Sequence, residues 1–333
     1  MQMKSSFLPI LFFSLLLVFS FPSLSHSVRC NPKDKKVLLK IKNDLRNPYH
    51  LASWDPNTDC CYWYVVKCDR KTNRINALTV FQANISGQIP AAVGDLPFLE
   101  TLQFHHITNL TGTIPPTIAK LTNLKMLRLS FTNLSGPIPQ FLSQLKNLFL
   151  LELNYNQFTG TIPSSLSELP NLLAIHLDRN KLTGQIPESF GNFRGQIPSL
   201  YLSHNSLTGP VPKSLGNLNF TTLDFSRNKL EGDVSFLFGK NKAIQIIDLS
   251  RNTLQFDISK VEFPESLTWL DLNHNRIFGR LPQGLKDLQL QNLNVSYNRL
   301  CGQIPQGGKL QSFDVYSYFH NKCLCGSPLP ECK

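Results

Sequence analysis

Acidic, basic and ring-bearing side chains recur along this chain at nearly constant spacing. Asp224, Asp248 and Asp271 follow one another at intervals of 24 and 23 residues, and a basic residue stands three positions after each aspartate. A pair of carboxylates is what a glycosidase places on either side of the scissile bond. These aspartates fall in successive repeats of an open pattern, however, and not in the walls of an enclosed subsite that could distort a sugar.

Histidines recur as well, but the other marks of an enzyme are missing from the sequence. His176, His204 and His274 stand in separate repeats, with no serine or cysteine nucleophile fixed beside them. Neither a glycine-rich phosphate loop nor a metal-spaced histidine set appears. We therefore expect a surface that binds another molecule, with no catalytic residue, metal or cofactor.

The element that positions these residues is a repeated block, L-[ST]-G-x-[IV]-P, which reads ISGQIP at 85–90 and LTGPVP at 207–212. The apolar residue before the proline slot marks each copy: Ile89, Ile114, Ile138, Ile162, Ile186, Val211, Val234, Ile258, Leu281 and Ile304. Successive markers lie 23 to 25 residues apart, which predicts ten coils of one solenoid.

Each coil carries the pattern LxxLxL before its block, as at Leu172, Ile175 and Leu177. Alternating apolar and polar residues indicate a short strand with one buried face, and such strands bury their leucines by stacking. We predict an α/β repeat that curves as a right-handed superhelix. Its concave side would be a parallel β-sheet and its convex side helical or 3-10.

Two coils depart from the block. Ser235 and Ser259 replace the proline in coils seven and eight, and Phe256 replaces the glycine in coil eight. Glycine permits a backbone bend that other residues avoid, and proline presets φ where the chain leaves the sheet. We therefore expect a local irregularity on the convex side at these coils.

A polar ladder position follows each strand. Seven coils place an asparagine there: Asn156, Asn180, Asn205, Asn228, Asn252, Asn275 and Asn298. An inward asparagine can satisfy backbone groups of its own coil and of the adjacent one. The first three coils carry Ala83, Thr108 and Thr132 instead, so we expect the ladder to be weaker at that end.

Both ends of the solenoid are expected to carry caps that cover the exposed core of the terminal coil. All eight cysteines lie at the ends: Cys30, Cys60, Cys61, Cys68, Cys301, Cys323, Cys325 and Cys332. Disulfides would staple such caps in an oxidising compartment. A zinc site is the alternative, but neither the C-x-C spacing near the C-terminus nor the adjacent cysteine pair suits it. Spacing alone leaves the pairing open.

The N-terminal cap is expected to contain a helix over residues 34–45, because Val37, Leu38, Ile41 and Leu45 share one helical face. At the start of the chain, a basic residue is followed by an apolar run and by a plausible cleavage site before Val28. This order predicts a secretory signal peptide. No later segment is apolar enough to cross a bilayer. We divide the chain into the signal peptide (1–27), the N-terminal cap (28–74), the repeats (75–300, the last coil running to about 305) and the C-terminal cap (301–333).

The chain is basic, with a formal net charge of +11. The excess collects outside the acidic columns, at Lys33, Lys35, Lys36, Lys40, Lys42, Arg70, Lys71, Arg74, Lys240 and Lys242. Charge holds a secreted basic protein on polyanions, and acidic polysaccharide suits this chain better than nucleic acid, which exported chains seldom meet. A general contribution to solubility is the alternative.

The outward side chains of the strands form the candidate working surface. The central column reads Thr79, Gln103, Arg128, Glu152, His176, Tyr201, Asp224, Asp248, Asp271 and Asn294. A second column, just before the ladder, reads Phe131, Tyr155, Arg179, His204, Arg227, Arg251, His274 and Tyr297. The arginines could simply offset the repulsion among the aspartates on a solvated face. Alternatively the strip recognises a protein, because aromatic residues and arginine concentrate at interface hot spots.

Five N-x-[ST] sequons fit an exported chain: Asn84, Asn109, Asn133, Asn219 and Asn294. The first three precede the repeated block directly, so glycans on them would lie along one edge. Asn294 falls in the tenth strand, where a glycan would obstruct the candidate surface, and we expect its occupancy to be lower.

The mature chain as a whole resembles the plant polygalacturonase-inhibiting proteins, which are secreted leucine-rich-repeat proteins of the cell wall. The resemblance rests on ten plant-type repeats, CCYWYVVKC at 60–68, the threonine ladder slot in RLSFTNLSG at 128–136, and LCGQIP followed by CLCGSPLPEC at 323–332. Receptor kinases share the repeat itself, so the two caps carry the specificity. The resemblance implies a leucine-rich-repeat solenoid as the fold class.

The resemblance also implies a function in plant defence. A member of this family binds fungal or insect endopolygalacturonases through its concave strands, limits pectin breakdown and associates with wall pectin. The implied cap pairing is Cys30–Cys60, Cys61–Cys68, Cys301–Cys323 and Cys325–Cys332. The implied partner-binding positions here are Gln103, His105, Arg128, Glu152, Leu173, His176, Tyr201, Asp224, Gln245, Asp248, Asp271 and Gln291. Arg128 interrupts an otherwise more acidic face.

Two alternatives belong to other functional classes. An antifreeze protein of carrot is similar in repeat count and caps, but an ice-binding face would be a flat array of threonines or asparagines, and the concave columns mix charges, rings and amides. A receptor ectodomain is the other alternative. Because no membrane helix follows the second cap, we expect at most a soluble partner of cell-surface receptors.

Overall fold

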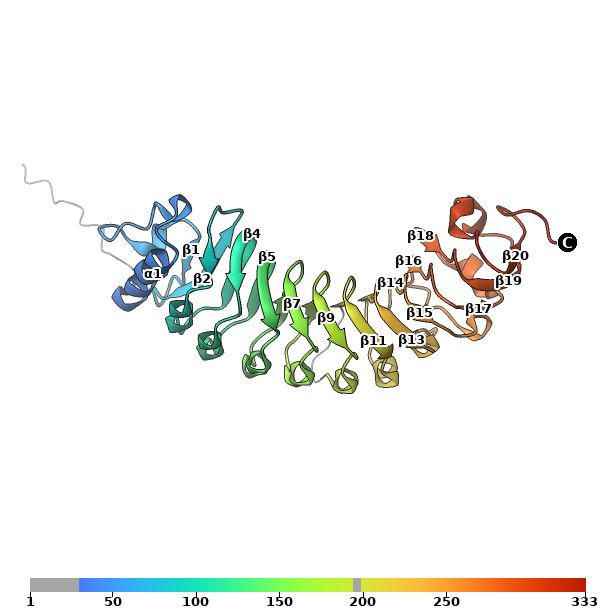
Figure 1. Ribbon diagram of the computed structural model, residues 1–333, viewed down its shortest axis with the longest axis horizontal. Helices are drawn as coiled ribbons and strands as arrows, with labels where there is room; N and C mark the ends of the chain where they lie inside the picture. The colour runs from blue at the N-terminus through green and yellow to red at the C-terminus, as the bar shows by residue number, and fades with distance from the viewer. Residues whose placement is uncertain (1–29, 194–198) are drawn as a thin grey trace, which may run out of the picture.

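The computed structural model describes residues 30–193 and 199–333, and the expected signal peptide at 1–27 lies outside the described residues. The coils stack side by side into a curved arc that runs from α1 (Pro32–Asp44) at the N-terminal end to β20 (Cys323–Cys325) at the C-terminal end (Figure 1). The predicted leucine-rich-repeat solenoid is confirmed.

One strand from each coil forms the concave sheet. These strands are β2 (Ile75–Phe81), β4 (Thr101–Gly112), β5 (Met126–Pro137), β6 (Leu150–Glu152), β8 (Ala174–His176), β10 (Ser199–Tyr201), β12 (Thr222–Asp224), β14 (Ile246–Asp248), β16 (Trp269–Asp271) and β18 (Asn292–Asn294). Neighbours pair in parallel, and β1 (Val66–Cys68) closes the N-terminal edge as an antiparallel strand. Stacked short strands thus share one core, as expected.

A second row of parallel strands, which the sequence analysis did not predict, arises from the repeated block itself. Its members are β3 (Gly87–Gln88), the later halves of β4 and β5, β7 (Gln157–Gly160), β9 (Lys181–Gly184), β11 (Ser206–Pro210), β13 (Lys229–Gly232), β15 (Thr253–Leu254), β17 (Phe278–Gly279) and β19 (Arg299–Gln303), which pairs with β20. Between β15 and β17 the ladder reduces to a bridge between Asp257 and Phe278. There the buried Phe256 fills the slot of a left-handed glycine such as Gly232 (φ 81°).

The convex side consists of short 3-10 helices: η3 (Ala91–Asp95), η4 (Pro116–Lys120), η5 (Gln140–Gln144), η6 (Ser164–Glu168), η7 (Glu188–Asn192), η8 (Lys213–Asn217), η9 (Ser235–Leu237), η10 (Ile258–Lys260) and η11 (Gln283–Asp287). Helices η9 and η10 have three residues each, whereas the others have five. These two belong to the coils with Ser235 and Ser259, so the expected irregularity is confirmed. A proline that presets φ before the turn accompanies each of the longer helices.

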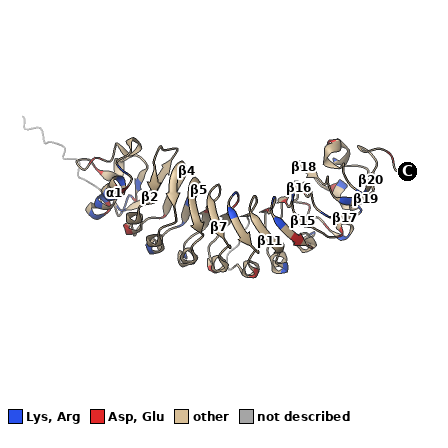
Figure 2. Cartoon of the chain, in the orientation of Figure 1, with Lys and Arg blue, Asp and Glu red and all other residues tan. Residues whose placement is uncertain are grey.

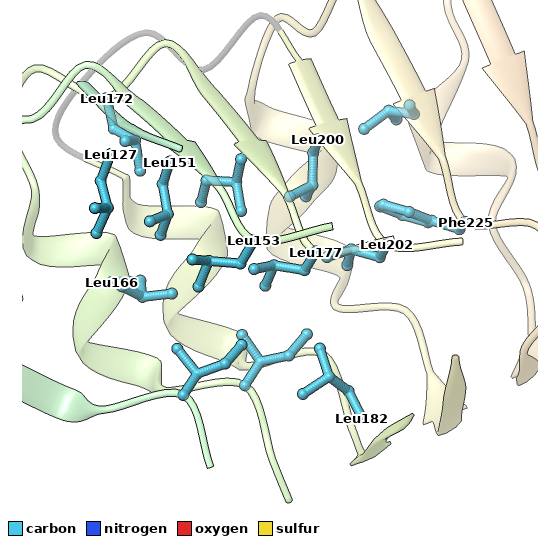
Figure 3. Packing of buried hydrophobic residues seen from close by; sticks show 14 of the residues in the cluster. Leu127, Leu151, Leu153, Leu166, Leu172, Leu177, Leu182, Leu200, Leu202 and Phe225 are labelled. Atoms are coloured by element: carbon cyan, nitrogen blue, oxygen red, sulfur yellow. The ribbon is translucent and has the colours of Figure 1, made fainter. Parts of the chain in front are cut away.

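The leucines of successive coils pack against one another along the arc. Leu151, Ile175 and Leu200 from three neighbouring coils are fully buried, and Figure 3 shows Leu153, Leu177, Leu202 and Phe225 in one continuous row. This row is the shared core that a single short strand could not form.

The asparagine ladder is confirmed at all seven predicted positions. In a typical rung, Asn180 Nδ2 donates to the carbonyl oxygens of Leu153 and Leu177, each at 3.0 Å, and Oδ1 accepts from the Phe158 amide at 3.0 Å. The remaining rungs repeat this arrangement at Asn156, Asn205, Asn228, Asn252, Asn275 and Asn298. Asn321, in the C-terminal cap, adds a rung that the sequence analysis missed, because its Oδ1 accepts from the Leu300 amide at 3.0 Å.

The prediction of Thr108 as a ladder residue is wrong. Ile107 pairs with Thr132 in register and is fully buried, whereas Thr108 is exposed. The register between β4 and β5 shifts directly after Ile107: the next β4 residue with a partner is Thr111, which pairs with Asn133, so Thr108 lies in the unpaired segment and outside the ladder. The N-terminal rungs at Ala83 and Ile107 therefore offer no polar side chain to the backbone, and the expected weakness of that end is confirmed.

The N-terminal cap covers the first coil with helix α1, whose residues Leu38 and Ile41 are buried, as is Leu45 directly after its end. An ion pair absent from the sequence analysis fixes this helix to β2. Arg74 donates from Nε and Nη2 to the buried Asp34 at 2.8 and 2.7 Å, and the Ile75 amide donates to the same carboxylate at 3.0 Å. The short helices η1 (Tyr49–Leu51) and η2 (Cys60–Tyr62) complete the cap.

Four disulfides staple the two caps, and their pairing is the one that the resemblance implied: Cys30–Cys60, Cys61–Cys68, Cys301–Cys323 and Cys325–Cys332. Since every cysteine is bonded to another, the zinc alternative is wrong. The C-terminal cap adds η12 (Leu310–Ser312) and η13 (Val315–Ser317), over the buried Tyr318. In the described part of the chain, no helix is long and apolar enough to span a membrane.

Candidate functional site

The central column of the concave sheet is in register across all ten strands. Thr79 pairs with Gln103, Gln103 with Arg128, and so on through Asp271 and Asn294. The period of the repeat had predicted this order, because one residue per coil at a fixed place in the strand must point the same way. The column therefore presents its side chains as a single line along the hollow of the arc.

Asp224, Asp248 and Asp271 occupy three neighbouring positions of this column and are half-buried. Burial, together with the charges of Asp271 and Asp224, raises the pKa of Asp248 to about 6, and burial is the largest of these causes. Burial also raises the pKa of Asp271 above its usual range. Each carboxylate accepts a hydrogen bond from the amide two residues later, as Asp248 does from Ser250 at 2.9 Å. Partial desolvation therefore makes the ionised forms of Asp248 and Asp271 unfavourable.

The arginines of the second column do not pair with these aspartates. Within the described residues, no lysine or arginine forms an ion pair with Asp224, Asp248 or Asp271. The second column sits at left-handed turns, with φ of 53° at Arg227 and 55° at Arg251, which end the strands. Direct ion pairing therefore does not neutralise this row, although the charge of Arg251 opposes the rise in the pKa of Asp271.

Elsewhere on the same column a full pair does form. Arg128 donates from Nε and Nη2 to the two carboxylate oxygens of Glu152, the latter at 2.8 Å, in the planar fork that suits a carboxylate. Arg128 thus neutralises its neighbour across the sheet, and the coils on this side carry no unpaired central charge. Next to them, the ring of His176 stacks on Tyr201 at 4.2 Å, and burial lowers the pKa of His176.

Asp178 is a fourth aspartate on this face, and the sequence analysis did not select it. It lies two residues beyond His176, and burial raises its pKa to about 6, with a further contribution from Asp224. One carboxylate oxygen of Asp178 and the side-chain oxygen of Asn154, the equivalent residue of the preceding coil, are buried without a hydrogen-bond partner. The strand pattern places Asp178 at an outward position, and this feature of the sequence could have identified it.

The second column, which lies at the left-handed turns, carries two stacks of rings. His106, Phe131 and Tyr155 lie face to face with centroids 4.2 and 3.9 Å apart, and Arg179 lies 4.9 Å above the Tyr155 ring. At the other end, Tyr297 lies between His274 and His320, at 4.0 and 4.3 Å. Sequence reasoning had omitted His106 and His320, although both occupy the residue before a ladder position. The stacks give the edge of the concave face a rigid aromatic border.

The other predicted positions lie on the same face. His105 Nδ1 lies 2.7 Å from Ser130 Oγ, and Gln103 lies beside Met126. Leu173, with 47% of its surface exposed, precedes β8, and the exposed Gln245 and Gln291 precede β14 and β18. All twelve predicted positions thus belong to one continuous strip, while their role in binding stays a prediction.

Two further residues of this strip were missed. Ile246 and Trp269 pair in register on β14 and β16 and expose 39% and 41% of their surfaces. They occupy the outward position two residues before Asp248 and Asp271. The strand pattern could have identified them, because an apolar residue in an outward slot departs from the alternation.

The basic clusters are less free than their sequence positions indicated. Figure 2 shows lysines and arginines on α1 and acidic residues interspersed among basic ones along the coils. Arg74 is held by Asp34, Lys40 pairs with Asp44 at 3.0 Å, and Lys240 pairs with Glu262 at 3.2 Å. The two lysine pairs are exposed and contribute little to stability, but all three pairs reduce the charge available to a polyanion.

The sequons differ in accessibility. Asn84, Asn109, Asn133 and Asn219 are exposed, whereas Asn294 is half-buried. The Oδ1 atom of Asn294 accepts from the amide and the hydroxyl of Ser296 at 3.1 and 2.7 Å. This geometry agrees with the expected order of occupancy, which itself stays a prediction.

Two family models match the chain. The leucine rich repeat N-terminal domain matches residues 31–69, and the Leucine Rich Repeat matches residues 123–145, 147–169, 171–193, 197–218, 266–288 and 289–308. These segments contain the N-terminal cap and six of the coils described above.

The chain is similar over nearly its full length to curated proteins. It is 72% identical over 325 residues to a polygalacturonase inhibitor of Pyrus communis, covering 97% of this chain and 98% of the relative. A polygalacturonase inhibitor of Vitis vinifera is 69% identical over 99% of this chain and 100% of its own. Among solved structures, a plant ice-binding protein superposes with a TM-score of 0.90 at 54% identity, covering 92% of this chain and 99% of that one.

Proposed function

The chain belongs to the polygalacturonase-inhibitor family of leucine-rich-repeat proteins, and we propose that it inhibits an endopolygalacturonase by binding the enzyme on its concave sheet. The observation that carries this proposal is the identity of about 70% to named inhibitors over both caps and all the coils between them. The target class that we propose is the fungal or insect enzyme that degrades pectin, in the setting of plant defence.

The dimensions of the concave sheet support a protein as the ligand. Ten parallel strands at about 4.8 Å spacing make a strip of about 43 Å, which is the scale of a protein interface and exceeds a small molecule. The strip combines unpaired acids, an arginine–glutamate pair and stacked rings. Such a surface supports specific recognition through charge complementarity with a basic partner.

We further propose that the protein acts outside the cell, in the plant cell wall, after removal of residues 1–27. Exposed lysines of the N-terminal cap, such as Lys33 and Lys36, are available to pectin carboxylates, and attraction of this kind weakens as salt rises. A pectin-binding assay at increasing ionic strength tests this part separately from inhibition.

The proposed activity is binding without catalysis. The contact between His105 and Ser130 is the arrangement closest to a base and a nucleophile among the predicted site residues, but Ser130 is 1% exposed and out of reach of a substrate. Asp224 and Asp248 lie on an open sheet, which does not enclose a sugar as a glycosidase site does.

The test is an inhibition and binding assay with purified protein and a panel of endopolygalacturonases. We expect the double variant Asp224→Lys with Asp248→Lys to bind a susceptible enzyme at least about tenfold more weakly, because two attractive contacts become repulsive. Asp287→Lys, at an exposed acid of the convex η11, is the matched control.

Each part of the proposal can fail separately in this assay. Absence of inhibition by the wild-type protein across the panel would overturn the function. Unchanged affinity of a folded double variant would place the contact surface elsewhere on the molecule.

Ice binding is a second candidate, favoured by the superposition on the plant ice-binding protein. The threonines of the second sheet are the nearest approach to a regular array, yet the hydroxyls of Thr111, Thr183 and Thr208 donate to glycine carbonyls of the adjacent coil. Strong thermal hysteresis in a solution of the purified protein would support this candidate over inhibition.

A further inference from the structure

Ile246 and Trp269 form an exposed apolar pair on the concave sheet. They are register partners on the neighbouring strands β14 and β16, both labelled in Figure 1. Within the described concave strands, no other register partners are both large, apolar and exposed. Met126, Leu150 and Ala174 in the same slot of other coils are also apolar but half-buried, so the exposure of the pair is a feature of these two coils.

The pair lies outside the buried core of the two coils. Ile247 and Leu270, the next residues on the two strands, are fully buried and already fill the core position of each coil. On the flanking strands the equivalent slots hold Thr222 and Asn292, which are polar. An exposed apolar pair between polar neighbours is typical of an interaction site, because exposing it to water is unfavourable.

The charge beside the pair indicates what would cover it. Asp248 and Asp271 point to the same face two residues further along the same strands, at about 6.6 Å for two strand residues. No ion pair neutralises them within the described chain, in contrast to Glu152, which Arg128 neutralises. An occupant that matches both features must be apolar over the isoleucine and tryptophan and cationic over the aspartates.

We propose that Ile246 and Trp269 are the apolar anchor that receives a long basic side chain, lysine or arginine, from the bound polygalacturonase. Its aliphatic stem lies on the indole and the isoleucine, and its charged head reaches Asp248 and Asp271. Long basic side chains combine these two characters, and a cation near an indole face gains further attraction. This inference rests on the proposed function and names the residues that determine affinity within it.

The test compares binding kinetics of single variants against one susceptible endopolygalacturonase. We expect Trp269→Ala to weaken binding about 30-fold, mainly through faster dissociation, and Ile246→Ala to weaken it about fivefold, because central aromatic anchors dominate interface energies. Trp269→Phe should retain part of the affinity. The matched control is Phe278→Ala, which removes an aromatic residue of equal exposure (40%) from the second sheet and should leave affinity unchanged.

Salt dependence separates the anchor from the charges beside it. Asp248→Asn should slow association and reduce the effect of salt on it, whereas Trp269→Ala should leave the salt dependence of association unchanged. The thermal unfolding midpoint of each variant checks that the coils remain folded; Asp248→Asn should raise it at neutral pH, because Asp248 is half-buried.

The outcomes are distinguishable. If the wild-type protein binds the enzyme and Trp269→Ala binds as tightly as the Phe278→Ala control, the inference is overturned and the proposed function stands. If Trp269→Ala instead abolishes self-association of the protein without affecting enzyme binding, a second copy covers the pair and the inference is also overturned. If the wild-type protein binds no enzyme, both fall together.

Discussion

Replacing Asp248 by asparagine should stabilise the protein at neutral pH and have little effect in acid. Burial raises the pKa of Asp248 from 3.8 to about 6. A carboxyl group whose pKa is higher in the folded state contributes stability below the unfolded pKa, and this contribution is lost as the pH rises through the folded value. The relevant window therefore runs from about pH 4 to about pH 6.

The size of the effect follows from the two pKa values. One pKa unit corresponds to about 1.4 kcal/mol, so ionisation of Asp248 costs the folded state about 3 kcal/mol at pH 7 and about 0.5 kcal/mol at pH 4. Asparagine carries no charge, and its side-chain oxygen can still accept from the Ser250 amide, which donates to Asp248 at 2.9 Å. We expect Asp248→Asn to recover most of this cost at pH 7, which corresponds to about 5 °C in the unfolding midpoint.

The assay is thermal and urea unfolding of the wild type and the variant at pH 4 and pH 7, with Asp287→Asn as the control at an exposed site. The control should shift the free energy of unfolding by less than about 0.5 kcal/mol at either pH. An equal gain at both pH values, or no gain at pH 7, would refute the argument that desolvation of Asp248 stores this energy.

Three further predictions concern the scaffold. Asn228→Ala should lower the free energy of unfolding by about 3 kcal/mol, because it leaves buried backbone groups of two coils unpaired, and a loss below about 1 kcal/mol in urea unfolding would contradict the ladder argument. Arg74→Met should lower the free energy of unfolding by about 3–5 kcal/mol, because it leaves the buried Asp34 unpaired. The double variant Arg74→Met with Asp34→Asn should regain part of this free energy, and no gain would count against the ion pair. Tyr318→Phe should cost about 1 kcal/mol, since the hydroxyl donates to the Leu310 carbonyl at 2.7 Å, and an unchanged unfolding midpoint would show that this bond contributes nothing.

The repeat made much of the fold predictable. The spacing of the leucines fixes which side chains of each strand point inward, and the fixed period brings equivalent positions of successive coils side by side. For this reason the ten residues from Thr79 to Asn294 could be ordered along the sheet before any coordinates were known. The seven ladder asparagines were predictable on the same grounds.

Local departures from the period were harder to predict. The count from neighbouring blocks places Thr108 in the ladder, but the strand register pairs Ile107 with Thr132 and so puts Ile107 in that position. The second sheet was missed because its strands are two to five residues long where they stand alone, and the glycine in the block resembles a turn signal. Trp269 was missed because reasoning from charge and from the resemblance directed attention to polar positions.

The sequence by itself determined the number of coils, the direction of each side chain relative to the core and the residues that make up the concave columns, because these depend on a period that the chain repeats. Only the tertiary structure decided which outward groups meet. Arg128 reaches Glu152, whereas Arg227 and Arg251 leave the aspartate row unpaired. Partners across the sheet lie more than 20 residues apart in the chain, so their pairing depends on strand register, left-handed turns and side-chain reach, which no local pattern records.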